Sequence, residues 1–387
     1  MERIRTEERA DWKEKAQALG FTFHHLDDRR YWDERAYYAL TLAQVEEGIE
    51  QPAHDLHQMC LALVDEVVKS EALMARLAIP EKSRDDVAEA WAAKAPSLYG
   101  RFDFAYDGKG PAKLFEYNAD TPTSIYETAG FQWVWLEDMI AAGRLPADAD
   151  QFNSLFEKLK ARFAELFPAG GFVHFASDPD ALEDRQTVRY LEDIAGQAGI
   201  EAKYVPIGGI GVDADGRLVD EDKFIIQALF KLYPWEEMLR EPYADHLKTS
   251  KTQFLEPAWK AVLSNKGLLP LLWERHEGHP NLLAAFFEDD PKAASLGGSY
   301  VKKPLFSREG ANIELVDEGR RAKVLDQGYG EEGHIRQALH PLTAFDGNYP
   351  VIGAWMVGDE PAGIGIREDR SRVTKNFSRF VPHAIVG

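Results

Sequence analysis

The chain has 387 residues, of which 45% are hydrophobic and 11% aromatic, the composition of a folded globular protein. Its 65 acidic and 45 basic residues give a formal net charge of −20, which disfavours nucleic acids and anionic membranes as partners. The single cysteine, Cys60, excludes an intrachain disulfide, and no apolar run reaches the roughly 18 residues that span a bilayer. We expect a cytoplasmic protein of two domains, or of one large domain, with no nucleic-acid or membrane partner.

The first part of the chain predicts helices followed by a hairpin. Apolar residues recur at three- and four-residue spacing in residues 6–19 and 41–78, which indicates amphipathic helices. Two strand-like runs follow at 98–106 and 112–118, separated by the turn sequence DGKGP. An aromatic-rich segment at 124–143 then predicts another helix, which ends near a glycine.

The rest of the chain changes character twice. A strand at 172–177, a helix at 181–198 and a strand in EAKYVPIGGI form an α/β unit. A strand and a short helix follow in KFIIQALFKLYPWEEML. From about residue 250, short apolar strands separated by glycine-containing turns dominate. The pattern predicts a mixed α+β protein with soft internal boundaries.

The hairpin places polar side chains on one face. If the two runs pair about the loop 108–111, residues whose numbers sum to 219 face each other. Asp103 then opposes Glu116, and Arg101 opposes Asn118. Because side chains alternate along a strand, these four share a face. The aromatic residues are expected on the other, packed face: Phe102, Phe104, Phe115 and Tyr117.

The opposed carboxylates have two explanations. Two acids directly across a ladder repel, so stability alone does not favour Asp103 opposite Glu116. Carboxylate and amide oxygens suit Mg²⁺, which takes one or two carboxylates and completes its shell with water and phosphate oxygens. The pattern leaves open either a magnesium site or a solvated face that Arg101 neutralises.

Three further segments carry cations in places where phosphate binding is plausible. In KKPLFSREGANI, Lys302 and Lys303 end a strand before a small, polar turn whose N–H groups can approach an anion. In LSNKG, Lys266 follows a helix-like run, and in GIGIRED, Arg367 follows two glycines. Each segment has an alternative, namely solvated lysines in the first two and a surface charge cluster in the third.

Taken in order, these pieces resemble the glutathionylspermidine synthase family, in particular its synthetase part and its stand-alone bacterial acid–amine ligases. The matching segments span essentially the whole chain: SLYGRFDFAYDGKGPAKLFEYNADTPTS, FKLYPWE, LEPAWKAVLSNKGLLPLLW, VKKPLFSREGAN and GIGIRED. The resemblance implies an ATP-grasp fold with an N-terminal pre-ATP-grasp-like region. It divides the chain into a helical region with the metal hairpin at 1–150, an α/β substrate region at 151–249 and a nucleotide-binding region at 250–387.

The resemblance also implies an activity. Family members join a carboxylate to an amine at the expense of ATP, with Mg²⁺, through an acyl phosphate. We therefore expect an ATP-dependent carbon–nitrogen ligase whose substrates are a peptide-like acid and an amine, polyamines included. The bifunctional members carry an amidase ahead of the synthetase, and this chain begins too late to contain one, so we expect no hydrolysis of the amide. The alternatives are an ATP-binding protein without catalysis, and an ATPase or carboxylate kinase without amine ligation.

Positions that match the family pattern imply a set of site residues. The metal ligands are Asp103, Glu116 and Asn118. The nucleotide-binding residues are Lys266, Lys303, Ser307, Glu309, Gly310, Gln337, Ala338 and Leu339, the last three at the adenine edge. The catalytic arginines are Arg101, beside the acceptor carboxylate, and Arg367, near the γ-phosphate. The substrate residues are Thr121, Glu183 and Asp184. Lys303 is preferred over Lys302 because it directly precedes the proline.

Overall fold

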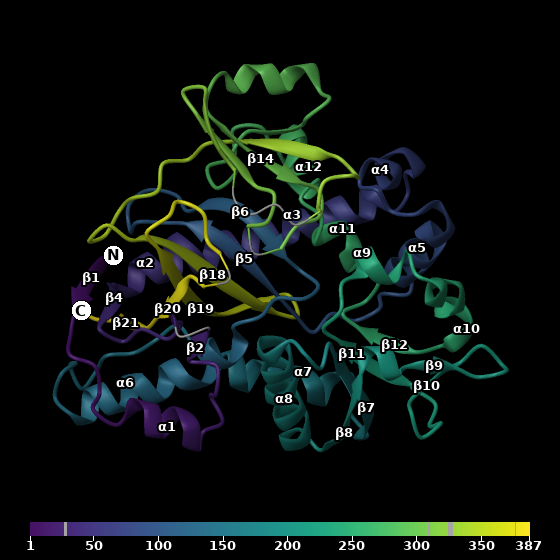
Figure 1. Ribbon diagram of the computed structural model, residues 1–387, viewed down its shortest axis with the longest axis horizontal. Helices are drawn as coiled ribbons and strands as arrows, with labels where there is room; N and C mark the ends of the chain where they lie inside the picture. The colour runs from purple at the N-terminus through teal and green to yellow at the C-terminus, as the bar shows by residue number, and fades with distance from the viewer. Residues whose placement is uncertain (27–28, 309, 324–327, 376) are drawn as a thin grey trace.

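The centre of the molecule is an antiparallel sheet that joins a hairpin from the first third of the chain to strands from its C-terminal part. Its five strands, in spatial order, are β20 (Arg379–Val381), β19 (Glu360–Asp369), β18 (Tyr349–Val357), β5 (Tyr99–Ala105) and β6 (Lys113–Asn118). The computed structural model describes residues 1–26, 29–308, 310–323, 328–375 and 377–387. The hairpin β5–β6 therefore lies at one edge of a sheet whose other strands come from the end of the chain (Figure 1).

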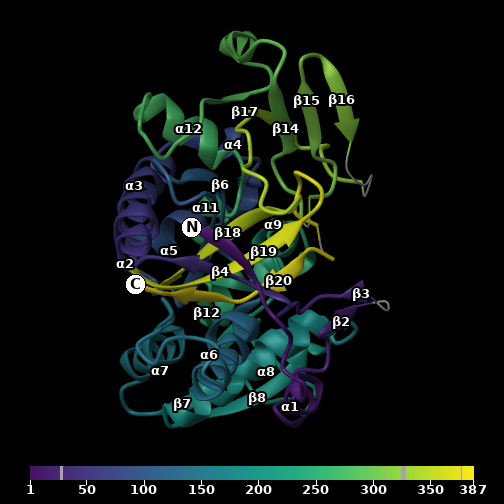
Figure 2. The same cartoon turned by 90° about the vertical axis from the view of Figure 1, so that its left-hand side faces the viewer.

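Two other large sheets flank the central one. The first is antiparallel: β13 (Ala285–Phe287), β17 (His334–Ala338), β14 (Tyr300–Pro304), β15 (Glu314–Asp317) and β16 (Arg320–Lys323). The second is parallel: β12 (Gln253–Leu255), β11 (Ala228–Lys231), β7 (Gly171–Ser177) and β8 (Ile200–Pro206). Figure 2 shows the β14 sheet at the top, the central sheet in the middle and the β7–β8 sheet at the bottom.

Smaller sheets tie the ends of the chain together. Strand β4 (Ala36–Leu40) pairs with β1 (Glu2–Arg5) on one side and with β21 (His383–Ile385) on the other. The remaining pairs are β2 (His25–Leu26) with β3 (Arg29–Arg30), and β9 (Gly211–Val212) with β10 (Leu218–Val219). The two termini consequently lie near each other (Figure 1).

Helices cover the sheets and fill the spaces between them. In the first half of the chain they are α1 (Trp12–Ala18), α2 (Leu42–Val45), η1 (Glu46–Glu50), α3 (Gln51–Val67), α4 (Glu71–Arg76), η2 (Glu81–Ser83), α5 (Arg84–Ala92), η3 (Glu127–Phe131), α6 (Gln132–Ala141), α7 (Leu155–Leu166) and α8 (Leu182–Gln197). In the second half they are η4 (Ile207–Gly209), α9 (Trp235–Met238), η5 (Pro242–His246), α10 (Leu247–Ser250), α11 (Lys260–Leu263), α12 (Leu268–Arg275) and η6 (Pro291–Leu296). Among the described residues, none of these helices combines the length and apolar character needed to cross a bilayer.

These elements confirm the predicted α+β class. The region with helical spacing at 41–78 forms a run of helices in which Thr41 caps the first and Ser70 caps α4, as their side-chain oxygens accept backbone N–H groups. The predicted helix at 6–19 is shorter than expected and begins at Trp12. The backbone N–H groups of Thr6 and Arg9 bond to the Arg35 carbonyl oxygen and the Glu34 carboxylate, so these residues do not join the helix.

The predicted hairpin register is confirmed from Arg101 to Asp103 and needs one correction closer to the turn. Asp103 pairs with Glu116 as expected. Beyond this pair the register shifts by one, so that Phe104 pairs with Leu114 and Phe115 is the extra residue of a bulge. The expectation that Phe115 joins the packed face is therefore wrong, and its side chain lines a pocket on the polar side.

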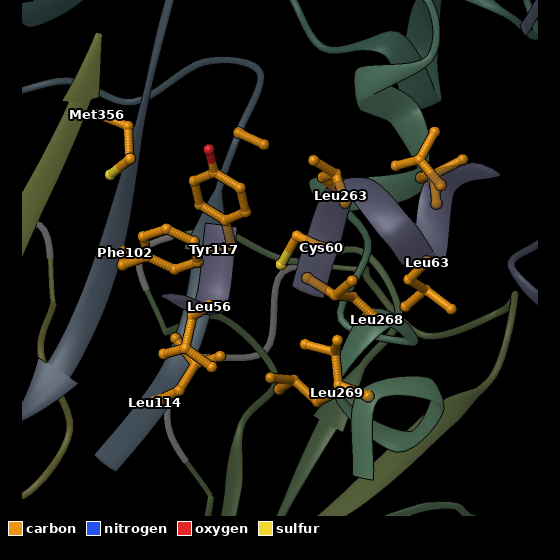
Figure 3. Close-up of a cluster of buried hydrophobic side chains, with 14 of the residues drawn as sticks. Leu56, Cys60, Leu63, Phe102, Leu114, Tyr117, Leu263, Leu268, Leu269 and Met356 are labelled. Carbon is orange, nitrogen blue, oxygen red and sulfur yellow. The ribbon is translucent and has the colours of Figure 1, made fainter. Parts of the chain in front are cut away.

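The aromatic back of the hairpin is anchored in the largest core. The rings of Phe102 and Tyr117 stack with centroids 3.8 Å apart, and both are nearly inaccessible to solvent. Cys60 of α3 lies in the same cluster, as its helical surroundings predict (Figure 3). The Tyr117 hydroxyl also lies 3.1 Å from His57 Nδ1. Packing on this side holds the polar face of the hairpin in a fixed position.

Candidate active site

The polar face of the hairpin forms one wall of two adjoining pockets. The first, which we call the apolar pocket, has an open volume of about 750 Å³ and lies between the hairpin and the β14 sheet. Its apolar lining is Phe115, Val301, Ile313, Leu315, Leu339 and Val351. The second, the polar pocket, has an open volume of about 1000 Å³, and Asp103 and Glu116 line both.

Every predicted site residue that the structure describes lines one of these pockets. In the apolar pocket are Lys303, Gln337, Ala338 and Leu339, and Gly310 borders both pockets. In the polar pocket are Arg101, Asn118, Thr121, Glu183, Asp184, Lys266, Ser307 and Arg367. Glu309 lies outside the described residues. The structure thus brings together side chains from positions 101 to 367, although their roles remain predictions.

Asp103 is paired with Arg101. The sequence left open a magnesium site or a face that Arg101 neutralises, and this ion pair corresponds to the second. Arg101 Nε donates to Asp103 Oδ1 at 2.7 Å, and a terminal nitrogen of the same guanidinium donates to Oδ2 at 3.2 Å. The Asn118 amide also donates to Asp103 at 3.2 Å. Burial raises the pKa of Asp103 despite the opposing effect of Arg101. The guanidinium itself is anchored by the carbonyl oxygen of Thr123 at 2.7 Å.

Glu116 is held by lysines instead. Lys266 Nζ lies 3.2 Å from the Glu116 carboxylate and also donates to the Ser307 carbonyl oxygen at 2.8 Å. Burial alone would raise the pKa of Glu116, but Lys266 and Lys303 outweigh it and lower that pKa to about 2. Glu116 is therefore ionised at neutral pH and available as an anionic ligand.

Lys303 is a buried ammonium group at the floor of the apolar pocket. Burial lowers its pKa to about 8, although Glu116 acts in the opposite direction. Its Nζ donates to the Phe115 carbonyl oxygen at 2.9 Å and to Gln337 Oε1 at 2.8 Å. The Gln337 amide nitrogen in turn donates to the Leu114 carbonyl oxygen at 3.0 Å. The Gln337 side chain thus orients Lys303 rather than pointing freely into the pocket.

Two serine hydroxyls in the polar pocket are buried without a hydrogen-bond partner among the described residues. They are Ser264 Oγ and Ser307 Oγ, and Lys266 lines the same pocket. A buried hydroxyl without a partner costs free energy, so such groups usually mark a place where a ligand or water completes the bonding. Together with the ammonium of Lys266, these hydroxyls fit an anion with several oxygens, such as a phosphate chain.

The loop that carries Gly310 approaches the segment around Thr374. Gly310 adopts φ of +73°, and a Cβ at this position would lie 2.8 Å from the Thr374 carbonyl oxygen. Only glycine fits both the backbone angle and this close approach. Gly310 and Thr374 both line the two pockets, so their contact closes the side of the site opposite the hairpin.

Sequence reasoning missed seven polar residues of the polar pocket, among them Ser264, Glu236, Arg308 and Lys375; the others are Asp120, Thr123 and Thr374. Arg308 donates to Thr121 Oγ1 at 2.9 Å and connects two segments that are 187 positions apart. Burial raises the pKa of Glu236. Ser264 and Arg308 lie in the same short sequence segments as Lys266 and Lys303. This closeness in sequence is the only sign of their place in the site that the sequence offers. Their contacts depend on tertiary structure that no local pattern encodes.

The donor set fits magnesium bound together with a phosphate-bearing molecule. Within the described parts of the chain, no group of three or more His, Cys, Asp or Glu side chains gathers as a metal cage. Mg²⁺ does not require such a cage, because it takes one or two carboxylates and completes its shell with water and phosphate oxygens. Asp103, Glu116 and Asn118 offer two carboxylates and an amide group on one face, next to the anion-binding groups. A bound metal would take the Asn118 amide oxygen in place of the nitrogen that donates to Asp103 here.

Comparison with known proteins gives matches over nearly the whole chain. A family model described as glutathionylspermidine synthase preATP-grasp matches residues 3–386. A Haemophilus influenzae protein with the name "Putative acid–amine ligase" is 39% identical and aligned over 98% of this chain and 98% of its own. Trypanothione synthetase from Crithidia fasciculata is 29% identical over 84% of this chain and 53% of its own. The bifunctional glutathionylspermidine synthetase/amidase of Escherichia coli is 28% identical over 90% of this chain and 59% of its own.

The matches define the class of protein first: an ATP-dependent carbon–nitrogen ligase. The chain belongs to the glutathionylspermidine synthase family, since the family model covers all but its first two residues and its last. It spans just over half the length of the trypanothione synthetase and of the bifunctional enzyme, and nearly all of the Haemophilus influenzae protein.

Proposed function

We propose that this protein is an ATP- and magnesium-dependent acid–amine ligase that forms an amide through an acyl phosphate. The observation that carries the proposal is the pair Asp103 and Glu116, opposed across one ladder on the wall shared by both pockets. Such a pair is costly for the fold alone and useful beside a phosphate chain. The relatives named trypanothione synthetase and glutathionylspermidine synthetase/amidase support the same chemistry.

The two pockets suggest a division of labour. We assign the apolar pocket to the adenine, with the ends of β17 at its edge, and the polar pocket to the triphosphate and the acid. In this arrangement residues 250–387 contribute an ATP-grasp nucleotide site, 1–150 the metal hairpin and 151–249 the substrate residues. Thr121, Glu183 and Asp184 line the polar pocket, and their hydroxyl and carboxylate groups suit the two organic substrates.

The chain's own residues have distinct roles in this proposal. Asp103, Glu116 and Asn118 would hold Mg²⁺, which when bound neutralises triphosphate charge and orients the γ-phosphate. Lys266 and Lys303 bind phosphate oxygens, and the hydroxyls of Ser264 and Ser307 complete their hydrogen bonding. These contacts hold the nucleotide in place.

The two arginines act at the reacting carboxylate. Arg101 and Arg367 both line a small inner cavity that adjoins the polar pocket. We propose that Arg101 positions the substrate carboxylate and that Arg367 stabilises the charge that develops as the phosphoryl group is transferred. The acid attacks the γ-phosphate, ADP leaves, and the amine then displaces phosphate from the acyl carbon. The acid we propose is peptide-like, and the amine is a polyamine or a related primary amine.

Replacement of Glu116 tests the site assignment. Glu116→Gln keeps the size of the side chain and removes its charge, and we expect ADP formation to fall by about 10²-fold or more. The exposed Glu14 supplies a control, since Glu14→Gln should leave turnover unchanged. Circular dichroism of both variants checks that the fold is intact. Wild-type ADP formation by a folded Glu116→Gln protein would overturn the metal assignment.

A further inference from the structure

Behind the proposed catalytic groups lies a buried carboxyl that none of the proposed roles uses. Glu127 of η3 is 1% exposed, and its Oε1 accepts a hydrogen bond from the Tyr31 hydroxyl at 2.5 Å. The Tyr31 oxygen in turn lies 3.1 Å from Ser124 Oγ. The three side chains form a continuous hydrogen-bonded chain, and all three are buried.

One end of this chain reaches the inner cavity. Ser124 lines the cavity together with Arg101, Asp103 and Arg367. Ser124 also adopts φ of +71°, a backbone conformation that residues other than glycine rarely take. Backbone strain of this kind persists only where surrounding contacts hold the residue in place, and strained residues cluster at functional sites. The Ser124 hydroxyl is thereby held between the cavity and Tyr31.

Glu127 differs from the other fully buried carboxylates of the molecule. Each of the following has a cation within 3.3 Å: Glu34 with Arg9, Asp120 with Lys231, Glu256 with Lys260 and Glu368 with Arg3. Glu127 forms no ion pair with any residue that the structure describes, and its side chain accepts instead from the phenol of Tyr31. A buried carboxylate without a paired cation is costly, so this group readily takes up a proton.

The charged groups around Glu127 set its proton affinity near neutral pH. Burial, reinforced by Glu183 of α8, raises its pKa to about 7, while Tyr31 and Arg367 of β19 oppose the increase. Tyr31 itself has a pKa well above the usual value, because of burial and the nearby Glu127. Tyr126, next in sequence to Glu127, also has a raised pKa from burial. Tyr31 therefore transmits a proton without holding a charge.

We propose that Ser124, Tyr31 and Glu127 form a proton relay that takes a proton from the ammonium form of the incoming amine. The inference rests on the proposed ligase function. An amine whose nitrogen reaches the inner cavity donates a proton to Ser124 Oγ, Ser124 passes its own proton to the Tyr31 oxygen, and Tyr31 passes its proton to the Glu127 carboxylate. The hydroxyls of Ser124 and Tyr31 are restored at the end of the transfer.

The protons and bonds of the amide-forming step then balance. The ammonium loses one proton to Glu127 and becomes a neutral amine. Its lone pair forms the new C–N bond, and the C–O bond to phosphate breaks with both electrons on the phosphate oxygen. The nitrogen's second proton goes to that phosphate. Glu127 finally returns its proton along the same chain to water.

Kinetics with two amines test the relay. The assay uses the full chain with ATP, Mg²⁺ and glutathione, and either spermidine, which is protonated at neutral pH, or hydroxylamine, which is not. We expect Tyr31→Phe and Glu127→Gln to lower the rate with spermidine by about 10²-fold and to leave the hydroxylamine rate within about threefold. The pH profile with spermidine should lose its limb near neutral pH in Glu127→Gln. The matched control is Tyr38→Phe, which removes the 2.7 Å hydrogen bond from Tyr38 to buried Glu368.

Infrared difference spectra, wild type minus Glu127→Gln, test the relay without turnover. A protonated carboxyl band at pH 6 that disappears by pH 8 supports the relay. Absence of that change, or equal losses with both amines, would overturn it. If wild type forms no conjugate with either amine, the proposed function fails on these substrates, and the infrared result still decides whether Glu127 can accept a proton.

Discussion

Asp103 and Glu116 face each other across the β5–β6 ladder, yet each carboxylate is bound to a different cation. Arg101 holds Asp103 at 2.7 Å from the same strand, and Lys266 approaches Glu116 to 3.2 Å from the segment before α12. Formally, Arg101 and Lys266 balance the charges of the two acids, so the opposed pair carries no uncompensated charge in the free protein. Both acids line both pockets, where a magnesium ion held by them would lie beside a bound phosphate chain.

Lys303 is expected to contribute to nucleotide affinity. Lys303→Met removes a buried ammonium, and loss of a hydrogen bond to a charged phosphate should weaken ATP binding by about tenfold or more in calorimetry. Lys302 is the matched control, because it lies next in the strand and binds Glu288 at 2.6 Å instead. Equal weakening in the two variants would show that the effect is general electrostatics rather than the predicted contact.

Ser264 should matter to the ligand and not to the fold. Its hydroxyl has no partner among the described residues, so Ser264→Ala removes no hydrogen bond from the free protein. We expect an unchanged or slightly higher melting temperature and ATP affinity reduced by roughly three- to tenfold. Ser97 has a similarly unpartnered, buried hydroxyl outside the pockets, so Ser97→Ala should change neither quantity. A matching affinity loss in Ser97→Ala would contradict the assignment.

Gly310 should be intolerant of a side chain for a steric reason. In Gly310→Ala, the new methyl group would meet the Thr374 carbonyl oxygen at 2.8 Å, and we expect a clear loss of ADP formation. Gly319 also has a positive φ, of +79°, but nothing lies within 4 Å of its added Cβ. Gly319→Ala therefore carries a similar backbone cost without the clash. Turnover that falls equally in both variants would exclude the contact as the cause.

Glu127 should make stability fall as pH rises. Its pKa is about 7 in the folded protein and roughly 4.3 when unfolded, so between these values the folded state binds more protons. Stability is full below about pH 4.5, decreases towards pH 7 and then levels off, with a total loss of the order of 3 kcal/mol. Melting temperatures of wild type and Glu127→Gln should accordingly diverge from pH 5 to pH 8. Parallel curves would contradict this account of Glu127.

Much of the hairpin could be predicted because its determinants are local. The alternation of polar and aromatic residues predicts the shared face and the pairing of Asp103 with Glu116. On the turn side of this pair Ala105 pairs with Lys113, so the turn length alone would not place Asp103 opposite Glu116. The bulge at Phe115 could not be predicted in this way. The Phe115 carbonyl oxygen accepts a hydrogen bond from Lys303, which is 188 positions away, and no local pattern contains that contact.

The other site residues also fall into those that the local sequence predicts and those that it does not. Lys266 and Lys303 stand out as cations beside turn sequences, so they could be found from the sequence. Tyr31 could not, because it lies in an aromatic-rich segment and meets Glu127 across 96 positions. A glutamate within an apparent core helix likewise gives no sign that it lacks a paired cation. Such features depend on how the three sheets pack together.

The most direct test of the proposed acid–amine ligase activity is the mass of the product. The full chain is incubated with ATP, Mg²⁺, a panel of peptide acids that includes glutathione, and a panel of amines that includes spermidine, and ADP is followed alongside mass spectrometry. We predict an amide conjugate that forms together with ADP only when acid, amine and Mg²⁺ are all present. The Glu116→Gln protein should form no conjugate. Release of ADP and phosphate that does not depend on the amine, with no conjugate of any acid, would contradict the proposed activity.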